Sequence, residues 1–167
     1  GGQGATATLA FTGDLTMAAG TRYTVDVTDA GQGDRLDVGG HARLEGGSVV
    51  SLGTGGNWNT ATTYTILSAA NGVTGTFGDV STDLAFLTPS LAYTANAVNL
   101  TLARNAVAFP DVALTRNERA TAGAIEALGG GAAAYDAILR LDAADARAAF
   151  DSLSGEIHAS VRTAIAD

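Results

Sequence analysis

The fold of this 167-residue chain is decided by residues 98–120, VNLTLARNAVAFPDVALTRNERA, where the spacing of the apolar residues changes. From Val98 to Leu102 every second residue is apolar, a period of two that indicates a β-strand with one buried face. Pro110 has no N–H to donate to a sheet and ends this pattern. Beyond Thr115 the chain is rich in alanine, and its apolar residues recur at helical spacing. We therefore expect a β body joined to a helical region at Pro110.

The β body, residues 1–109, repeats the period-two pattern in many short segments bounded by Gly, Asn or Asp. Glycine pairs at 39–40, 46–47 and 55–56 indicate tight corners, because glycine tolerates positive φ. Short strands between such corners favour a mainly β fold, a right-handed parallel β-helix of a few rungs. A β-sandwich also fits, since no strict repeat is present, although sandwich strands are usually longer.

One part of the β body is expected to cap its end. A solenoid exposes unpaired backbone and apolar side chains at its last rung, which must be covered. Residues 64–103 are the most apolar and aromatic part of the body, with Phe77, Phe86 and Tyr93 around the strand breaker Pro89. We expect this segment to form capping hairpins.

The helical region, residues 110–167, is expected to hold four helices. The first follows a capping box, Thr115 to Glu118, and ends at the glycines 129–131. Further helices are expected around Tyr135 and after the capping residues Asp142 and Ser154.

The tail from Ala143 to Asp167 carries an apolar stripe of Phe150, Leu153, Ile157 and Val161. An isolated helix of this length is marginal in water. We therefore expect the tail to pack against its own chain or against a second copy, which would make the fragment self-associate.

Composition excludes several classes of site. The formal net charge of −8 disfavours nucleic acid or anionic lipid as a partner, because neutralising phosphates requires clustered cations. The chain has no cysteine, and hence no disulfide, thiolate metal site or cysteine nucleophile. It shows neither a signal peptide nor an apolar run long enough to span a membrane as a helix. Because it opens on Gly1 rather than methionine, we expect a piece of a longer protein.

Ser154, Glu156 and His158 suggest a hydrolase, but their spacing does not support one. Residues two apart on a helix point about 200° apart, so Glu156 and His158 do not share a face. No Gly-x-Ser-x-Gly nucleophile elbow is present. His41 stands alone among small residues. We predict that the chain is not an enzyme and has no catalytic residue.

Four aspartates, Asp26, Asp29, Asp34 and Asp37, suggest a calcium site, yet they match neither the nonapeptide repeat nor the EF-hand spacing. Carboxylates that cap turns are the simpler interpretation. Trp58 fits either a ring that stacks on a sugar or a ring that lies over a corner of the coil. No metal or cofactor site is predicted.

The order of several motifs resembles one family, the autotransporters of type V secretion. The segments similar to the final passenger rungs are Thr21–Val27, Gly33–Leu36 and Ala42–Gly47. Those similar to the C-terminal stable core, or autochaperone, are Tyr64–Ala69, Gly72–Phe77, Leu84–Leu87 and Val98–Leu102. Asn117–Ala120 and Leu153–Ser160 are similar to the linker before the translocator barrel.

This resemblance implies a structural secretion module at the Gram-negative cell surface. It would fold early, template the upstream passenger and thread a helix through a twelve-strand translocator barrel expected after Asp167. The implied partners are the upstream passenger, that barrel and the outer-membrane assembly machinery.

Two other functions stay open. An adhesin would use the exposed face of the β-helix, with Trp58 and Tyr64 in contact with its target. Alternatively, the chain is the non-catalytic end of a protease or esterase passenger whose active site lies upstream of Gly1.

Overall fold

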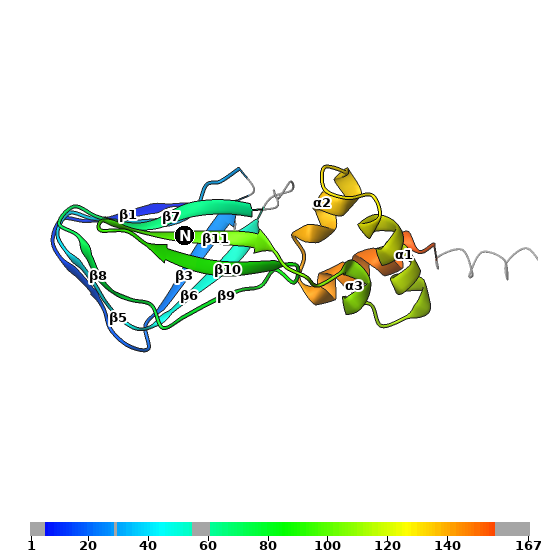
Figure 1. Ribbon diagram of the computed structural model, residues 1–167, viewed down its shortest axis with the longest axis horizontal. Coiled ribbons are helices and arrows are strands. Elements are labelled where there is room, and N and C mark those ends of the chain that lie inside the picture. The colour runs from blue at the N-terminus through cyan, green and yellow to red at the C-terminus, as the bar shows by residue number, and fades with distance from the viewer. Residues whose placement is uncertain (1–5, 29, 55–60, 156–167) are drawn as a thin grey trace, which may run out of the picture.

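The computed structural model describes residues 6–28, 30–54 and 61–155, which form a β body followed by three α-helices (Figure 1). The described chain is mainly β, and helical structure begins only at Phe109. The predicted change from strand to helix around Pro110 is therefore confirmed.

The β body contains three successive groups of three strands, here called rungs. The first rung is β1 (Thr8–Phe11), β2 (Leu15–Met17) and β3 (Arg22–Thr28). The second is β4 (Arg35–Val38), β5 (Ala42–Glu45) and β6 (Ser48–Thr54). The third is β7 (Ala61–Ala69), β8 (Val73–Thr76) and β9 (Asp79–Thr82). Strands of successive rungs pair in parallel, in the orders β1-β4-β7, β2-β5-β8 and β3-β6-β9. This pairing is consistent with a β-helix and not with an antiparallel sandwich.

Apolar side chains at equivalent positions of successive rungs build the core. Leu9 pairs with Leu36, and Leu36 pairs with Leu67. In the third sheet, Tyr23 pairs with Val49. Every second side chain of a strand therefore points into the interior and pairs with the equivalent side chain of the next rung. This explains why strands of a few residues are long enough to build the core.

A hairpin of β10 (Leu87–Tyr93) and β11 (Ala97–Arg104) covers the third rung. β11 pairs antiparallel with β7, and β10 forms the outer edge of that sheet, whereas β8 and β9 are the last strands of the other two sheets. Pro89 lies in β10, where its missing N–H makes the edge less available for further pairing. The strands β8 and β9 fall inside the segment 64–103 expected to form the cap, but they belong to the third rung.

Four helical segments follow: the 3₁₀-helix η1 (Phe109–Val112), α1 (Arg116–Glu126), α2 (Ala133–Leu139) and α3 (Ala143–Leu153). We call residues 109–153 the helical unit. The predicted capping box is confirmed, since Thr115 Oγ1 accepts a hydrogen bond from Glu118 N at 3.1 Å and the Glu118 carboxylate accepts from Thr115 N at 3.3 Å. The same carboxylate also accepts from Leu114 N at 2.6 Å. These backbone donors, Leu114 foremost, hold the pKa of Glu118 below its usual value.

The other helix predictions have mixed outcomes. Asp142 caps α3, because its Oδ1 accepts from Ala144 N and Asp145 N, each at 2.8 Å. Ser154 is the C-cap of α3, and the fourth helix expected after it lies outside the described residues. Phe150 is fully buried, so the described part of the tail packs against its own chain.

Candidate functional site

The first rung presents a free edge, here called the open end. β1, β2 and β3 are edge strands of their sheets, and no described strand pairs with their outer sides. The later half of β3 is partly covered, since Asp34 N donates to Asp26 O at 2.8 Å. β1 and β2 contain neither a proline nor a charged residue, the features by which proteins usually block an edge.

At the open end Leu9 is uncovered, whereas Met17, Tyr23 and Val25 of the same rung are buried. Leu9 is 57% exposed although it pairs with Leu36, which in turn pairs with the fully buried Leu67. Beside Leu9 lies a hollow of about 170 Å³, whose lining includes Leu36, Tyr23 and Asp34. An engineered cavity of about 150 Å³ in another protein binds benzene, so this hollow can hold one apolar side chain.

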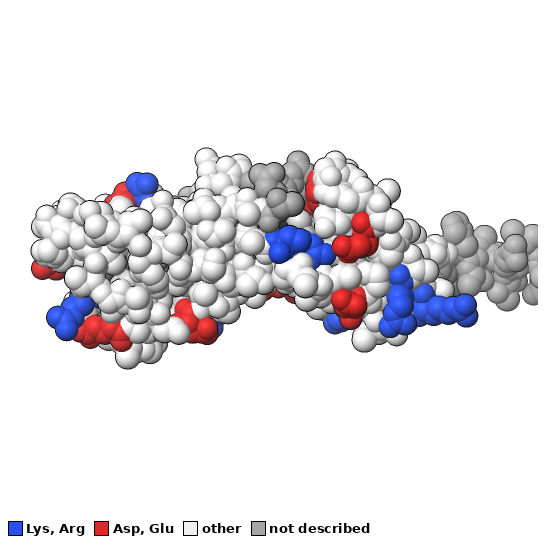
Figure 2. Space-filling view, in the orientation of Figure 1, with Lys and Arg blue, Asp and Glu red and all other residues white. Residues whose placement is uncertain are grey.

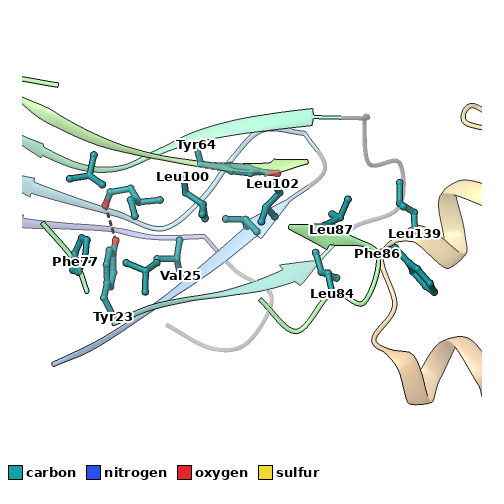
Figure 3. Close-up of a cluster of buried hydrophobic side chains, with 14 of the residues drawn as sticks. Tyr23, Val25, Tyr64, Phe77, Leu84, Phe86, Leu87, Leu100, Leu102 and Leu139 are labelled. Carbon is teal, nitrogen blue, oxygen red and sulfur yellow. Dashed lines mark hydrogen bonds between the residues drawn. The ribbon is translucent and has the colours of Figure 1, made fainter. Parts of the chain in front are cut away.

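Tyr23 ties the open end to the rest of the body. Its hydroxyl donates to Ile66 O at 2.8 Å, which joins the first rung to the third (Figure 3). Its ring stacks on Phe77 with the ring centres 6.4 Å apart. Burial, reinforced by the nearby Asp34 carboxylate, raises the pKa of Tyr23 well above its usual value.

This pKa shift predicts an alkaline weakness. A group whose folded-state pKa is raised contributes stability that is complete below its unfolded pKa, about 10 for tyrosine, and that is lost as the pH rises beyond it. We expect the free energy of unfolding to fall above about pH 10 and Tyr23→Phe to remove part of that fall. At pH 7 the free energy of unfolding of the variant should be about 1 kcal/mol lower than that of wild type, because the hydrogen bond to Ile66 O is lost. Urea unfolding at both pH values measures this, and an equal alkaline fall in the variant would contradict it.

Aspartates join neighbouring rungs at their corners. Asp34 Oδ1 accepts from Ala7 N at 2.6 Å, and its Oδ2 accepts from Asp26 N at 3.1 Å. Asp14 Oδ1 accepts from His41 N at 2.7 Å. Each carboxylate thus satisfies backbone donors that no ladder pairs, as the turn-capping interpretation expects.

Three of the four aspartates considered for calcium are described, and they do not form a metal site. Asp37 pairs with Arg35 and accepts from Ser68 Oγ, and these two contacts, Ser68 first, hold the pKa of Asp37 below its usual value. Asp34 is engaged with the backbone as described, and Asp29 lies outside the described residues. Within the described residues no three His, Cys, Asp or Glu side chains gather as a metal site would require.

The other candidates that the structure describes are not gathered into a site either. Tyr64 is 2% exposed and its hydroxyl donates to Thr28 O at 2.7 Å, so the expectation that it contacts a partner as an exposed residue is wrong. His41 is exposed, and Ser154 Oγ donates to Asp151 O at 2.8 Å. Two further sets of candidates, Trp58 and the pair Glu156 and His158, lie outside the described residues.

Sequence reasoning missed two features, Leu9 as an uncovered core residue and Arg104 as a hub of hydrogen bonds. The sequence cannot distinguish Leu9 from a buried residue, because apolar residues of an alternating strand usually belong to the core. Arg104 ends a strand and looks like a surface cation, yet its side chain is only 17% exposed.

Charge does not mark a binding surface on the face in view. Figure 2 shows that most of this face of the β body is uncharged, and side chains of both signs occur at its edges and on the helical end. Among the described residues, no helix has the length and apolar character needed to cross a bilayer.

Comparison with known proteins gives two relatives and no matching family model. The chain is 37% identical over 130 residues to an extracellular serine protease of Serratia marcescens, an alignment that covers 72% of this chain. It is 32% identical over 124 residues to a second extracellular serine protease of the same organism, with 69% of this chain covered. The chain spans only 12% of the length of each relative. It is thus similar to a limited region of much longer extracellular proteins.

Proposed function

We propose that this chain is the C-terminal, non-catalytic part of an autotransporter passenger, displayed at the Gram-negative cell surface. Its β body forms the last rungs of a right-handed parallel β-helix and acts as an autochaperone. It folds early and offers its open end to the preceding rung, which then pairs with β1, β2 and the first half of β3. Residues 110–167 link this body to the translocator barrel.

The observation that carries the proposal is the contrast between the two ends of the β body. At one end the β10–β11 hairpin pairs with β7, contacts β9 through β10 and accepts a hydrogen bond from Val73 N of β8 at Ala95 O, with Pro89 on its outer strand. The other end leaves edge strands unpaired by any described strand and leaves Leu9 exposed over a hollow. Exposed edges of this kind recruit further strands. A template that grows in one direction requires this polarity.

The relatives support the extracellular part of the proposal. Both are named extracellular, and the matched region is a small fraction of each. Their names favour a second, compatible candidate, in which this chain is the non-catalytic end of a protease passenger whose active site lies in the remainder. The adhesin alternative loses one of its two contact residues, because Tyr64 is buried.

The test compares two equally exposed leucines in the complete secreted protein. Leu9 is 57% exposed at the open end, and Leu128 is 58% exposed on the helical unit. In the isolated chain, Leu9→Glu and Leu128→Glu should each change the free energy of unfolding by no more than about 0.5 kcal/mol. In the complete protein, Leu9→Glu should lower the protease-resistant passenger at the cell surface several-fold, because a charge would be buried under the preceding rung.

The Leu128→Glu variant should display the passenger like wild type. Equal display from both variants would remove the template function from the open end. Equal loss from both would mean that the substitutions harm secretion in general, and would also reject the proposal.

A further inference from the structure

The β body and the helical unit meet through two short segments, residues 84–86 and 104–109. Ala85 N donates to Leu141 O at 3.1 Å. Figure 3 shows Leu84, Phe86 and Leu139 gathered where the strands lead into the helices. Buried residues of both parts belong to one hydrophobic cluster, so the side chains at this contact help to determine how the two parts are joined.

Arg104 is the centre of this contact. From the last position of β11, its Nη1 donates to Phe86 O at 3.3 Å and to Val107 O at 2.7 Å. Its Nε donates to the Tyr135 hydroxyl of α2 at 3.2 Å. Its Nη2 lies 3.2 Å from Glu126 Oε1 of α1. One guanidinium therefore joins the hairpin, the connecting loop and two helices.

Aromatic rings surround the same guanidinium. The Arg104 Cζ lies 5.6 Å from the centre of the Phe86 ring and 5.3 Å from that of Phe109, within the range of cation–π attraction. The Phe109 ring meets the Phe86 ring edge to face, with the ring centres 4.7 Å apart, and its centre lies 4.8 Å from that of the Tyr135 ring. Glu126 completes the cluster, because its Oε2 accepts from Phe109 N at 2.7 Å. A lysine could not replace the planar fork of donors in this cluster.

We propose that Arg104 locks the helical unit onto the capping hairpin, so that the β body and α1–α3 form one rigid body. This inference rests on the proposed function and refines it: the three helices stay with the passenger outside the membrane and do not occupy the pore of the barrel. Arg104 is the positioning residue of this joint.

The size of the helical unit supports its exclusion from a pore. A single α-helix with its side chains is about 10–12 Å across. Barrels of eight strands are filled by their own side chains, and an open aqueous channel is found in barrels of about 16–18 strands. The twelve-strand barrel that the family resemblance implies would lie between these limits and would suit one helix. α1 and α3 pack side by side with Ala122, Ala146 and Phe150 fully buried, so the unit would have to unfold to enter.

The absence of cysteine allows two spin labels to be placed without other changes. Ser90 on β10 and Ala148 on α3 are both exposed. Labels on Ser90→Cys and Ala148→Cys measure the distance between the capping hairpin and the helical unit. Ala120→Cys and Ala148→Cys, both on the helical unit, report on its internal fold. We expect a narrow distance distribution for both pairs in the full 167-residue chain.

With Arg104→Met, the Ser90–Ala148 distribution should broaden while the Ala120–Ala148 distribution stays narrow. Arg104→Lys should broaden the first distribution too, because charge alone does not restore the fork of hydrogen bonds. The matched control is Arg43→Met, which removes an exposed ion pair of 2.8 Å with Glu45 and should leave both distributions narrow.

A narrow Ser90–Ala148 distribution in Arg104→Met would overturn the lock. Broadening of both pairs would overturn it as well, because Arg104 would then support the helical fold and not its docking. In the complete protein on intact cells, Ala148→Cys should react with a membrane-impermeant maleimide, and protection would overturn the exclusion from the pore. The spin-label result needs no secretion, so its failure is distinguishable from failure of the Leu9 test.

Discussion

Phe86→Ala is expected to lower the free energy of unfolding by about 3–5 kcal/mol, the usual range for emptying a buried aromatic site. The Phe86 ring is fully buried between the capping hairpin and the helical unit. The Phe86→Ala variant loses the edge-to-face contact with Phe109 in addition to the apolar burial of the ring. Since the ring touches both parts of the molecule, the β signal and the helical signal in circular dichroism should both shift to lower urea.

Leu153→Ala is the control for this prediction, because Leu153 is a large apolar residue that is exposed. It should change the free energy of unfolding by about 0.5 kcal/mol or less. Urea unfolding midpoints and slopes of both variants give the comparison. A Phe86→Ala variant within about 1 kcal/mol of wild type would show that the ring is not part of the core.

The elements that local chemistry determines could be predicted from the sequence. The period of two up to Leu102, the proline at 110 and the capping box at Thr115 each act within a few residues, and the structure has the corresponding strand, break and helix. Asp142 as a helix cap belongs to the same class. Such signals do not depend on what the segment packs against.

The parts that depend on distant contacts could not be predicted. The alternating pattern around Tyr64 predicts that one face of its strand is buried. It does not predict that the Tyr64 hydroxyl reaches Thr28 O in the first rung. The pairing of Leu9 with Leu36, and of Leu36 with Leu67, follows from corner geometry, which no strict repeat in the sequence reveals. The same holds for Arg104, whose partners come from segments up to 31 positions away along the chain.

The sequence predicts glycines at tight corners. Gly75 lies within a strand instead, and the stacking of rungs explains why glycine is needed there. Gly75 is in β8 with φ of 75°, the left-handed region that favours glycine. It pairs with Leu44 of the second rung, and a Cβ at this position would collide with Leu44 O. Gly20 has a similar φ of 85°, but a Cβ there would meet no atom within 4 Å.

Gly75→Ala is therefore expected to cost about 2–5 kcal/mol, the sum of the left-handed backbone penalty and of overpacking against a backbone oxygen. Gly20→Ala carries the backbone penalty alone and should cost about 1–2 kcal/mol. The difference between the two variants in urea unfolding measures how closely the second and third rungs approach each other. Equal costs would mean that the rungs can separate at Gly75 without loss of stability, and close stacking at that position would not contribute to the rigidity that a folding template requires.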